Sequence, residues 1–309
     1  MFKIFILSIF CLTVKAFNPQ RDHPYYIPSF LGGAVKVGGG SGHREIEYES
    51  NKVIVDQQVY KYNDLNLEAM ISPWEHFVIG FSGAYDPDRE YEIKFGPGSS
   101  RSEDEQYSSS SSGFLDPEVF LIYQIKSGKD SWNQQIKLQG NPFDIKEKPR
   151  KIYRGGHDIF LDYRFSHQYD NGALFGTLFS HYFGKKNFYQ PGDPRLSISD
   201  PYTEVGIDLG YLLRFNKRWS LKVQGTFGLI SDYVVRTPEV TRSADKGYML
   251  QGLLGLNFRV NPNNILSVEG HRGSRIFNAT NEEINRDIEY EIENDFLLFK
   301  WSYFWEGMK

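Results

Sequence analysis

Three polar residues spaced two apart, Ser267, Glu269 and His271, form the most suggestive catalytic arrangement in this sequence. In an extended strand every second side chain points to the same face, so these three would lie in line as a nucleophile, an orienting carboxylate and a base. Lipid hydrolases built on β-barrels place a His and a Ser two residues apart, and none of the seven histidines is followed by Ser at that spacing. Three polar residues on one strand face more often line a hydrated wall than form a catalytic site. We therefore rank a lipid hydrolase third among the candidate functions.

Other serine and histidine pairs do not make a better site. Ser166-His167 and Ser180-His181 are adjacent, so a strand would send their side chains to opposite faces. Ser41-Gly42-His43 has the required spacing in reverse, but it lies in a glycine-rich stretch. The sequence also lacks the H-E-x-x-H, G-x-S-x-G and phosphate-loop motifs. We therefore predict no catalytic residue, no metal and no cofactor.

The elements that would position these side chains are strands. Apolar residues alternate with polar or small ones over 204–215, and the same period of two returns over 219–231 and 247–260. This period is typical of a strand with one apolar face. We count about twelve such segments, near residues 30–40, 57–71, 77–86, 117–127, 132–141, 154–167, 173–184, 202–215, 219–231, 247–260, 264–276 and 290–304.

The links between these segments alternate strictly in length, which favours one fold over the others. The short links lie near 72–76, 128–131, 168–172, 216–218 and 261–263, and the long ones near 41–56, 87–116, 142–153, 185–201, 232–246 and 277–289. Tight turns on one side and long loops on the other are typical of a transmembrane antiparallel up-and-down β-barrel. A secreted sandwich or propeller would alternate too, but it has no reason to sort its links by length.

We therefore predict an all-β barrel of about 12 strands. Ten or fourteen strands remain open, because the segments near 30–40 and 132–141 are the least secure. The last segment carries Phe299, Trp301, Tyr303 and Trp305 on one face, as the terminal strand of such barrels does.

Composition and the first residues agree with an exported barrel. The 309 residues carry a formal charge of −4, which gives no reason to expect a nucleic-acid partner. The aromatic content of 16% suits strands with Tyr and Trp at membrane interfaces. A charged start and the apolar run Ile4–Val14 predict a signal peptide over 1–16, leaving one barrel domain over 17–309. The only cysteine, Cys11, falls in that leader, so the exported chain would have no disulfide.

The polar face of the predicted strands carries charges of both signs. Ion pairs along the wall are one interpretation, because charges in a narrow lumen must be paired or hydrated. A hydrated path whose selectivity those charges set is the other, and the two are compatible. The charged residues assigned to this face are Asp64, Glu68, Glu118, Lys126, Lys137, Asp158, Asp162, Arg164, Glu204, Asp208, Arg214, Lys222, Arg259, Glu269 and Lys300.

The longest link, Asp86 to Asp116, is acidic and includes the serine run Ser108–Ser112. Low complexity and charge predict a solvated, mobile loop. Two alternatives stay open, a constriction folded into the mouth of the barrel and a divalent-cation site, although the loop lacks the Gly and Asx spacing of a calcium loop.

Several segments resemble a known family in pattern. They are Gly113–Val119 with the strand that follows it, Gly156–Phe165, Ala173–Phe183 and Tyr202–Ile230. Over roughly residues 60–260 these resemble barrels of the phenol meta-degradation pathway type transporter family. The resemblance implies an outer-membrane protein that admits small, often aromatic or hydrophobic compounds.

The sequence thus predicts a passive outer-membrane channel for small solutes. A non-conducting structural or surface-interaction barrel, with its lumen closed by ion pairs, is the alternative. The expected partners are outer-membrane lipid and lipopolysaccharide, the barrel assembly machinery and a small-molecule solute. The residues that we predict to line or narrow the path are Glu118, Asp162, Arg164, Asp208, Arg214, Lys222 and Arg259.

Overall fold

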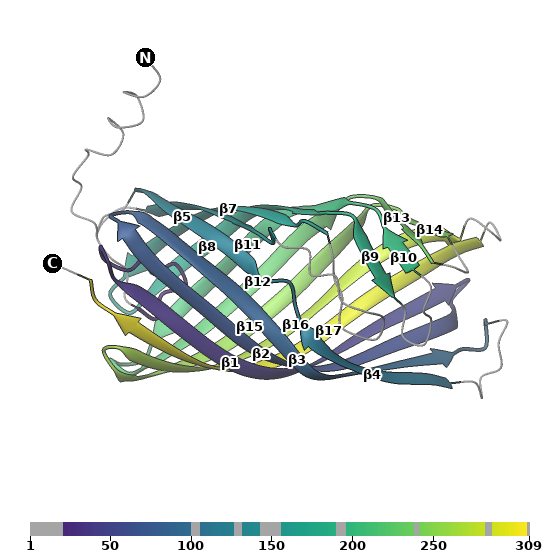
Figure 1. Cartoon of the computed structure of the whole chain (residues 1–309), viewed down its shortest axis with the longest axis horizontal. Helices are drawn as coiled ribbons and strands as arrows, with labels where there is room; N and C mark the ends of the chain where they lie inside the picture. The colour runs from purple at the N-terminus through teal and green to yellow at the C-terminus, as the bar shows by residue number, and fades with distance from the viewer. Residues whose placement is uncertain are drawn as a thin grey trace, which may run out of the picture.

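The computed structural model describes residues 21–99, 106–126, 132–142, 156–189, 196–237, 241–281 and 286–307. These residues form one antiparallel sheet that closes on itself, because the first strand, β1, pairs with the last, β17 (Figure 1). The register of that closure is continuous from Gly33 opposite Trp305 to Glu49 opposite Glu289. In the described part of the chain, no helix has the length and apolar character needed to cross a membrane.

Within the described residues, 12 long strands form the wall, and each of the twelve predicted segments coincides with one of them. The prediction of a 12-stranded antiparallel barrel is therefore confirmed, including the two least secure segments, which are β1 and β6. The wall strands are β1 (Gly33–Ser50), β2 (Val53–Trp74), β3 (Phe77–Phe95), β5 (Glu118–Lys126), β6 (Asn133–Gly140), β7 (Ile159–Tyr169), β8 (Gly172–Phe183), β11 (Tyr202–Arg214), β12 (Trp219–Ile230), β15 (Gly247–Asn261), β16 (Asn264–Asn281) and β17 (Arg286–Trp305).

The two ends of the barrel differ in their connections (Figure 1). At one end β1 begins, β17 ends and tight turns join β2 to β3, β7 to β8, β11 to β12 and β15 to β16. We call this the turn end and the opposite one the loop end. Shorter strands extend the loop end, namely β4 (Gln106–Phe114), β9 (Lys186–Tyr189), β10 (Leu196–Ser199), β13 (Tyr233–Arg236) and β14 (Thr241–Ala244).

The predicted long loops over 41–56 and 277–289 are wrong. β1 and β2 continue through the first of these segments and are joined by Asn51 and Lys52, whose φ angles of 51° and 64° make a two-residue hairpin. β16 and β17 likewise continue into the second, with 282–285 outside the described residues. The apolar pattern stops there although the strands do not, because the outer face carries glutamates instead of lipid-facing residues.

The prediction of a mobile loop over 86–116 is also wrong for the residues described there. β3 continues to Phe95, and the serine run belongs to β4, which pairs with it in register, Glu90 lying opposite Ser110. Residues 100–105 lie outside the described part. A serine run pairs here because the backbone of β3 supplies the hydrogen bonds, so the strand needs no apolar face of its own.

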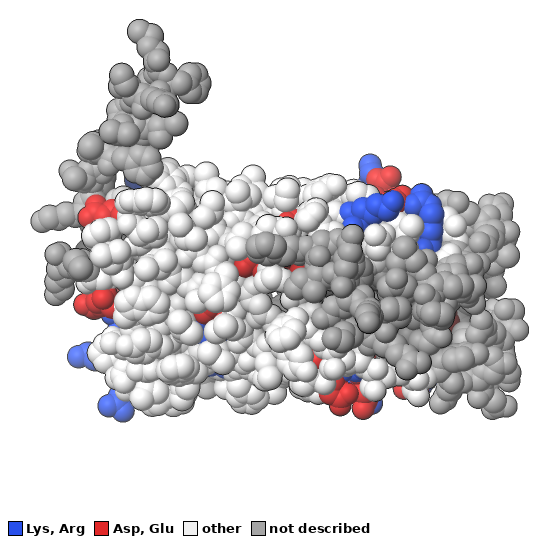
Figure 2. All heavy atoms as spheres, viewed as in Figure 1, with Lys and Arg blue, Asp and Glu red and all other residues white. Residues whose placement is uncertain are grey.

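The wall has an apolar outer face and a packed, polar inner face. Leu65, Leu67 and Ile71 on β2 are 42–56% exposed, as lipid-facing residues of a membrane barrel are. Figure 2 shows that this face of the barrel is broadly free of charged side chains over its middle. Inside, glycines admit aromatic rings: a Cβ on Gly210 would lie 2.4 Å from the ring of Phe175. The barrel interior is therefore partly filled by its own side chains.

Candidate functional site

The middle of the inner wall carries ion pairs that join strands across the sheet. Lys36 on β1 lies 2.6 Å from Glu68 on β2. Glu269 on β16 accepts from Lys222 on β12 at 2.8 Å and from Lys300 on β17 at 3.2 Å. Since Glu269 is 8% exposed, its charge is compensated inside the wall. One carboxylate thus ties three strands together at mid-height.

A second cluster lies on β7, β8 and β11. The carboxylate of Asp162 accepts from Arg164 and His181, each at 3.0 Å. Asp208 accepts from the hydroxyl of Thr226 at 2.5 Å. The cluster places carboxylates, a guanidinium and an imidazole together on one stretch of wall.

Glu118 on β5 is held by neutral donors. Its carboxylate accepts from Ser82 at 3.2 Å and from the side-chain amide of Gln139. These two donors come from β3 and β6, so Glu118 links three neighbouring strands.

At the turn end the segment Arg21–Leu31, which precedes β1, contacts the inner wall through Asp22, Tyr25 and Ile27. Asp22 accepts from Arg214 on β11 at 3.1 Å and from Arg259 on β15 at 3.2 Å. The side chains of Asp22 and Arg214 are 7% and 8% exposed, so this pair is buried. A carboxylate shared between two guanidinium groups anchors the segment to the wall.

Further contacts hold this N-terminal segment along its length. The hydroxyl of Tyr25 lies 2.7 Å from that of Thr177, and the Gln135 side-chain amide donates to the Tyr25 carbonyl at 2.8 Å. The guanidinium of Arg164 lies 5.3 Å from the centre of the Tyr25 ring. Ile27 is 3% exposed and packs with β-strand residues such as Phe120. The segment therefore has both polar and apolar anchors.

The predicted lining residues separate into two groups in the structure. Glu118, Asp162, Arg164, Asp208 and Lys222 lie on the middle of the inner wall. Arg214 and Arg259 lie nearer the turn end, where both bind Asp22. The structure therefore pairs these two arginines with Asp22 of the chain's own N-terminal segment, which Arg164 contacts through the ring of Tyr25.

One predicted inner-wall residue is misplaced. Lys126 is exposed at the end of β5, after a register shift between Gln124 and Lys126. The shift is the physical reason for the error, because one displaced residue reverses which face the next side chain takes. The sequence pattern around 124–126 does not reveal it.

Sequence reasoning missed Asp22, His23 and Tyr25 entirely. The predicted signal peptide lies in residues 1–20, outside the described part, and the residues after it were given no role. The available signal was a charged and aromatic stretch, Arg21–Tyr26, ahead of the first strand in a chain whose later strands carry unexplained inward arginines.

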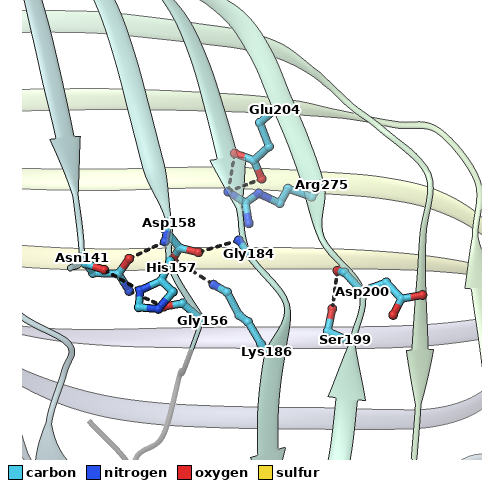
Figure 3. A network of polar contacts seen from close by, with 10 residues as sticks. All are labelled: Asn141, Gly156, His157, Asp158, Gly184, Lys186, Ser199, Asp200, Glu204 and Arg275. Carbon is cyan, nitrogen blue, oxygen red and sulfur yellow. Dashed lines mark hydrogen bonds and ion pairs between the residues drawn. The ribbon is translucent and has the colours of Figure 1, made fainter. Parts of the chain in front are cut away.

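At the loop end a polar network fixes the start of β7 (Figure 3). Asp158 accepts from the Gly184 backbone N–H at 3.0 Å and from Lys186 at 3.2 Å. Nearby, Glu204 on β11 pairs with Arg275 on β16 at 3.1 Å, and Glu204 is 2% exposed. These two predicted inner-wall acids therefore hold strands together near the mouth.

On the loop-end side of these pairs, aromatic rings line the inner wall from β7 round to β1. We call this set the aromatic arc. Successive ring centres lie 4.6–5.8 Å apart, within the range of stacked and edge-to-face contacts. The Tyr233 and Tyr290 hydroxyls lie 2.5 Å apart. The members of the arc are Phe160, Phe183, Tyr202, Tyr233, Phe277, Tyr290 and Tyr48.

The suggested catalytic trio does lie on one strand face, but its carboxylate is engaged elsewhere. Glu269 binds Lys222 and Lys300, and its nearest contact to His271 is 3.8 Å. Ser267 is 6% exposed. Among the described residues, no group of three or more His, Cys, Asp or Glu side chains is placed to hold a metal ion.

On the outer face, beyond the apolar band, β1 and β17 present glutamates directly opposite one another, and we call this the glutamate ladder. The opposed pairs are Glu45 with Glu293, Glu47 with Glu291, and Glu49 with Glu289. They border a hollow of about 280 Å³. Partial burial, and then the neighbouring carboxylates, raise the pKa of Glu47 and of Glu291.

Comparison with known proteins finds the likeness in the fold. No protein-family model matches this chain. No curated protein matches it either. The COG4313 outer membrane channel from Pseudomonas putida F1 is 9% identical, with 92% of this chain and 99% of that one covered and a TM-score of 0.55.

Two further solved structures have lower scores. The outer membrane protease OmpT from Escherichia coli is 12% identical, with 92% and 99% covered and a TM-score of 0.40. The TodX monoaromatic hydrocarbon channel is 9% identical, with 90% and 91% covered and a TM-score of 0.40. At the level of fold, the predicted resemblance to an outer-membrane barrel is confirmed.

Proposed function

We propose that the protein is a passive channel for small solutes in the outer membrane of a diderm bacterium. The observation that carries the proposal is a closed 12-stranded wall that is apolar outside and charged inside. Backbone groups can cross lipid only in a helix or a closed barrel, and a charged inner wall favours water and polar solutes over lipid. Twelve strands enclose less space than a general porin, which suits small solutes.

The aromatic arc supports small aromatic or hydrophobic compounds as the solute class. Phe277 and Tyr290 are buried in the wall, whereas Phe160, Phe183 and Tyr202 are half-buried and leave part of their apolar ring surface accessible. A ring-shaped solute entering at the loop end would meet the arc first and the charges of Asp162, Arg164 and Asp208 next. Weak contacts in series favour passage, because a solute must bind well enough to enter and weakly enough to leave.

We assign the lumen charges the role of narrowing and tuning this path. Glu118, Asp208 and Lys222 face the middle of the lumen, whereas Arg214 and Arg259 act through the N-terminal segment that they anchor. The expected surroundings are outer-membrane lipid and lipopolysaccharide on the apolar face, after insertion by the barrel assembly machinery.

The test is single-channel recording of the refolded chain in a planar bilayer, after a heat-modifiable gel shift shows that the barrel has folded. We expect discrete steps whose ion selectivity changes in Asp208→Ala. Silence from a folded barrel, at every voltage and pH, would exclude the channel.

A non-conducting surface-interaction barrel is the second candidate, and one observation favours it. The N-terminal segment and the buried residues around Ile27 fill the turn end, and the glutamate ladder faces outward above the membrane. A folded barrel that stays silent even when Asp22 is replaced would favour this function. A lipid hydrolase is disfavoured, because the Ser267, Glu269 and His271 side chains line the inside whereas lipid lies outside.

A further inference from the structure

We propose that the N-terminal segment Arg21–Leu31 is an acid-released closure of the turn end, with His23 as its trigger. The effect on solute flow rests on the proposed channel function, whereas the release itself does not. The closure is built from contacts that a single proton on His23 disturbs, and His23 itself precedes the first membrane-spanning strand.

The surroundings of His23 require a neutral imidazole. The residue is 3% exposed, with its ring centre 5.7 Å from that of Tyr25 and 6.3 Å from that of Phe175. Its Nδ1 accepts a hydrogen bond from the Tyr25 backbone N–H at 3.0 Å. Nδ1 therefore carries no proton, and Nε2 has no hydrogen-bond partner among the described residues. A second proton would break the Nδ1 bond and create a cation without an acceptor.

The charged groups around His23 do not offer such a cation a partner. Its own segment supplies Asp22, but that carboxylate is already shared by Arg214 of β11 and Arg259 of β15. β8 contributes the uncharged Phe175 and Thr177 beside the segment. The remaining charges act on the neighbouring Tyr25, and they are Arg164 and Asp162 of β7 and Asp208 of β11.

Burial first, and then Arg214, lower the pKa of His23 to about 4, against 6.5 for a free imidazole. The docked segment therefore binds fewer protons than the released one between these two values. Docking is at full strength above pH 6.5 and weakens as pH falls toward 4. At pH 5 the linkage favours release by about 30-fold relative to neutral pH.

The test is hydrogen–deuterium exchange of peptides covering Arg21–Leu31 in the full chain, reconstituted in lipid vesicles, at pH 7.5 and pH 5. Protection factors corrected for the intrinsic pH dependence should fall by about 30-fold in the wild type. His23→Asn is the matched control, because an Asn side-chain oxygen accepts from the N–H two residues on without titrating. His23→Phe keeps a ring of similar size and also cannot titrate. Both should show equal protection at the two pH values.

Two outcomes would overturn the proposal. One is a wild type equally protected at both pH values, and the other is a His23→Asn variant that loses protection to the same extent as the wild type. Recording conductance of the same samples separates this inference from the channel function. Release of the segment without any current would support the acid-released closure and contradict the channel function. Current without pH-dependent protection would support the channel function and contradict the closure.

Discussion

The turn end and the loop end of this barrel are narrowed by different means. At the turn end a separate segment sits inside the wall, anchored by Asp22 between Arg214 and Arg259. At the loop end the wall itself contributes the aromatic arc, with rings such as Tyr202 and Tyr290 fixed on strands. A segment can leave as a unit, whereas rings on strands can only change rotamer.

This difference predicts where large and small effects lie. The contacts of the N-terminal segment include one carboxylate shared by two guanidinium groups, and removing one partner of such a buried cluster is strongly destabilising. Contacts within the arc are many and individually weak. A single substitution at the turn end should therefore release the whole segment, whereas one at the loop end should change solute binding only partly.

The largest effect is expected from Asp22→Ala. Removing the shared carboxylate leaves the buried Arg214 and the partly exposed Arg259 without their common partner, a loss of about 3 kcal/mol in docking. We expect the variant to conduct at the open level for most of the recording. The exchange protection of the N-terminal segment should fall by about 100-fold. Asp200→Ala is the control, because the Asp200–Arg236 pair at the loop end is 32% and 48% exposed and such pairs contribute about 0–1 kcal/mol. Equal effects of the two variants would contradict the comparison.

A smaller effect is expected from Tyr290→Ala in the aromatic arc. This ring stacks on Phe277 at 4.7 Å and on Tyr48 at 5.6 Å, so its loss separates Tyr48 from the rest of the arc. Tyr290 is 8% exposed and acts by holding its neighbours in place, so with about 0.5–1.5 kcal/mol per ring pair, block of the current by phenol should weaken by up to about tenfold. Tyr290→Phe keeps the ring and loses only the hydroxyl pair with Tyr233. Phenol should block the current of this variant as strongly as it blocks that of the wild type. If the Phe variant weakens block as much as the Ala variant, the hydroxyl and not the stack is responsible.

The two ends also differ in how far sequence could predict them. The wall strands were predictable because lipid on one side and side-chain packing on the other impose a period of two on residues such as Val205 and Leu209. The strand extensions were not, because above the lipid the outer face becomes charged and the apolar residues lie on the inner face. There Ile46 and Tyr48 alternate with Glu45 and Glu47, a pattern that a lipid-facing apolar band does not predict.

The candidate site was predictable only from its wall side. Period two assigned Asp162, Asp208 and Lys222 to the inner face, but it could not say which charge meets which. The anchor of Arg214 lies 192 residues earlier in the chain. A contact at that separation leaves no spacing in the sequence, because it depends on the closure of the whole sheet.

A still smaller effect is expected from Glu269→Gln at the middle of the lumen. The variant leaves Lys222 and Lys300 without their shared counter-charge, so the wall gains net positive charge at its centre. The reversal potential in a salt gradient should shift toward anion selectivity by a few-fold in permeability ratio. Lys222→Met makes the opposite change and should shift it toward cations. Shifts in the same direction for both variants would show that ions do not pass these residues.

The smallest effect is expected at the glutamate ladder, from Glu47→Gln. Like charges directly opposite on paired strands cost about 0.2–1 kcal/mol, so at pH 7.5 the variant should stabilise the tips of β1 and β17 by that amount. Because the folded-state pKa of Glu47 is raised, its carboxylate weakens the fold above that pKa and ceases to do so as falling pH protonates it. The gain should therefore disappear on acidification, measured as exchange protection of 43–50. Glu90→Gln is the control, since Glu90 lies 3.7 Å from Lys61 and its charge is already balanced. A gain in that variant, or one for Glu47→Gln that persists at acidic pH, would show that opposed charge is not what strains the ladder.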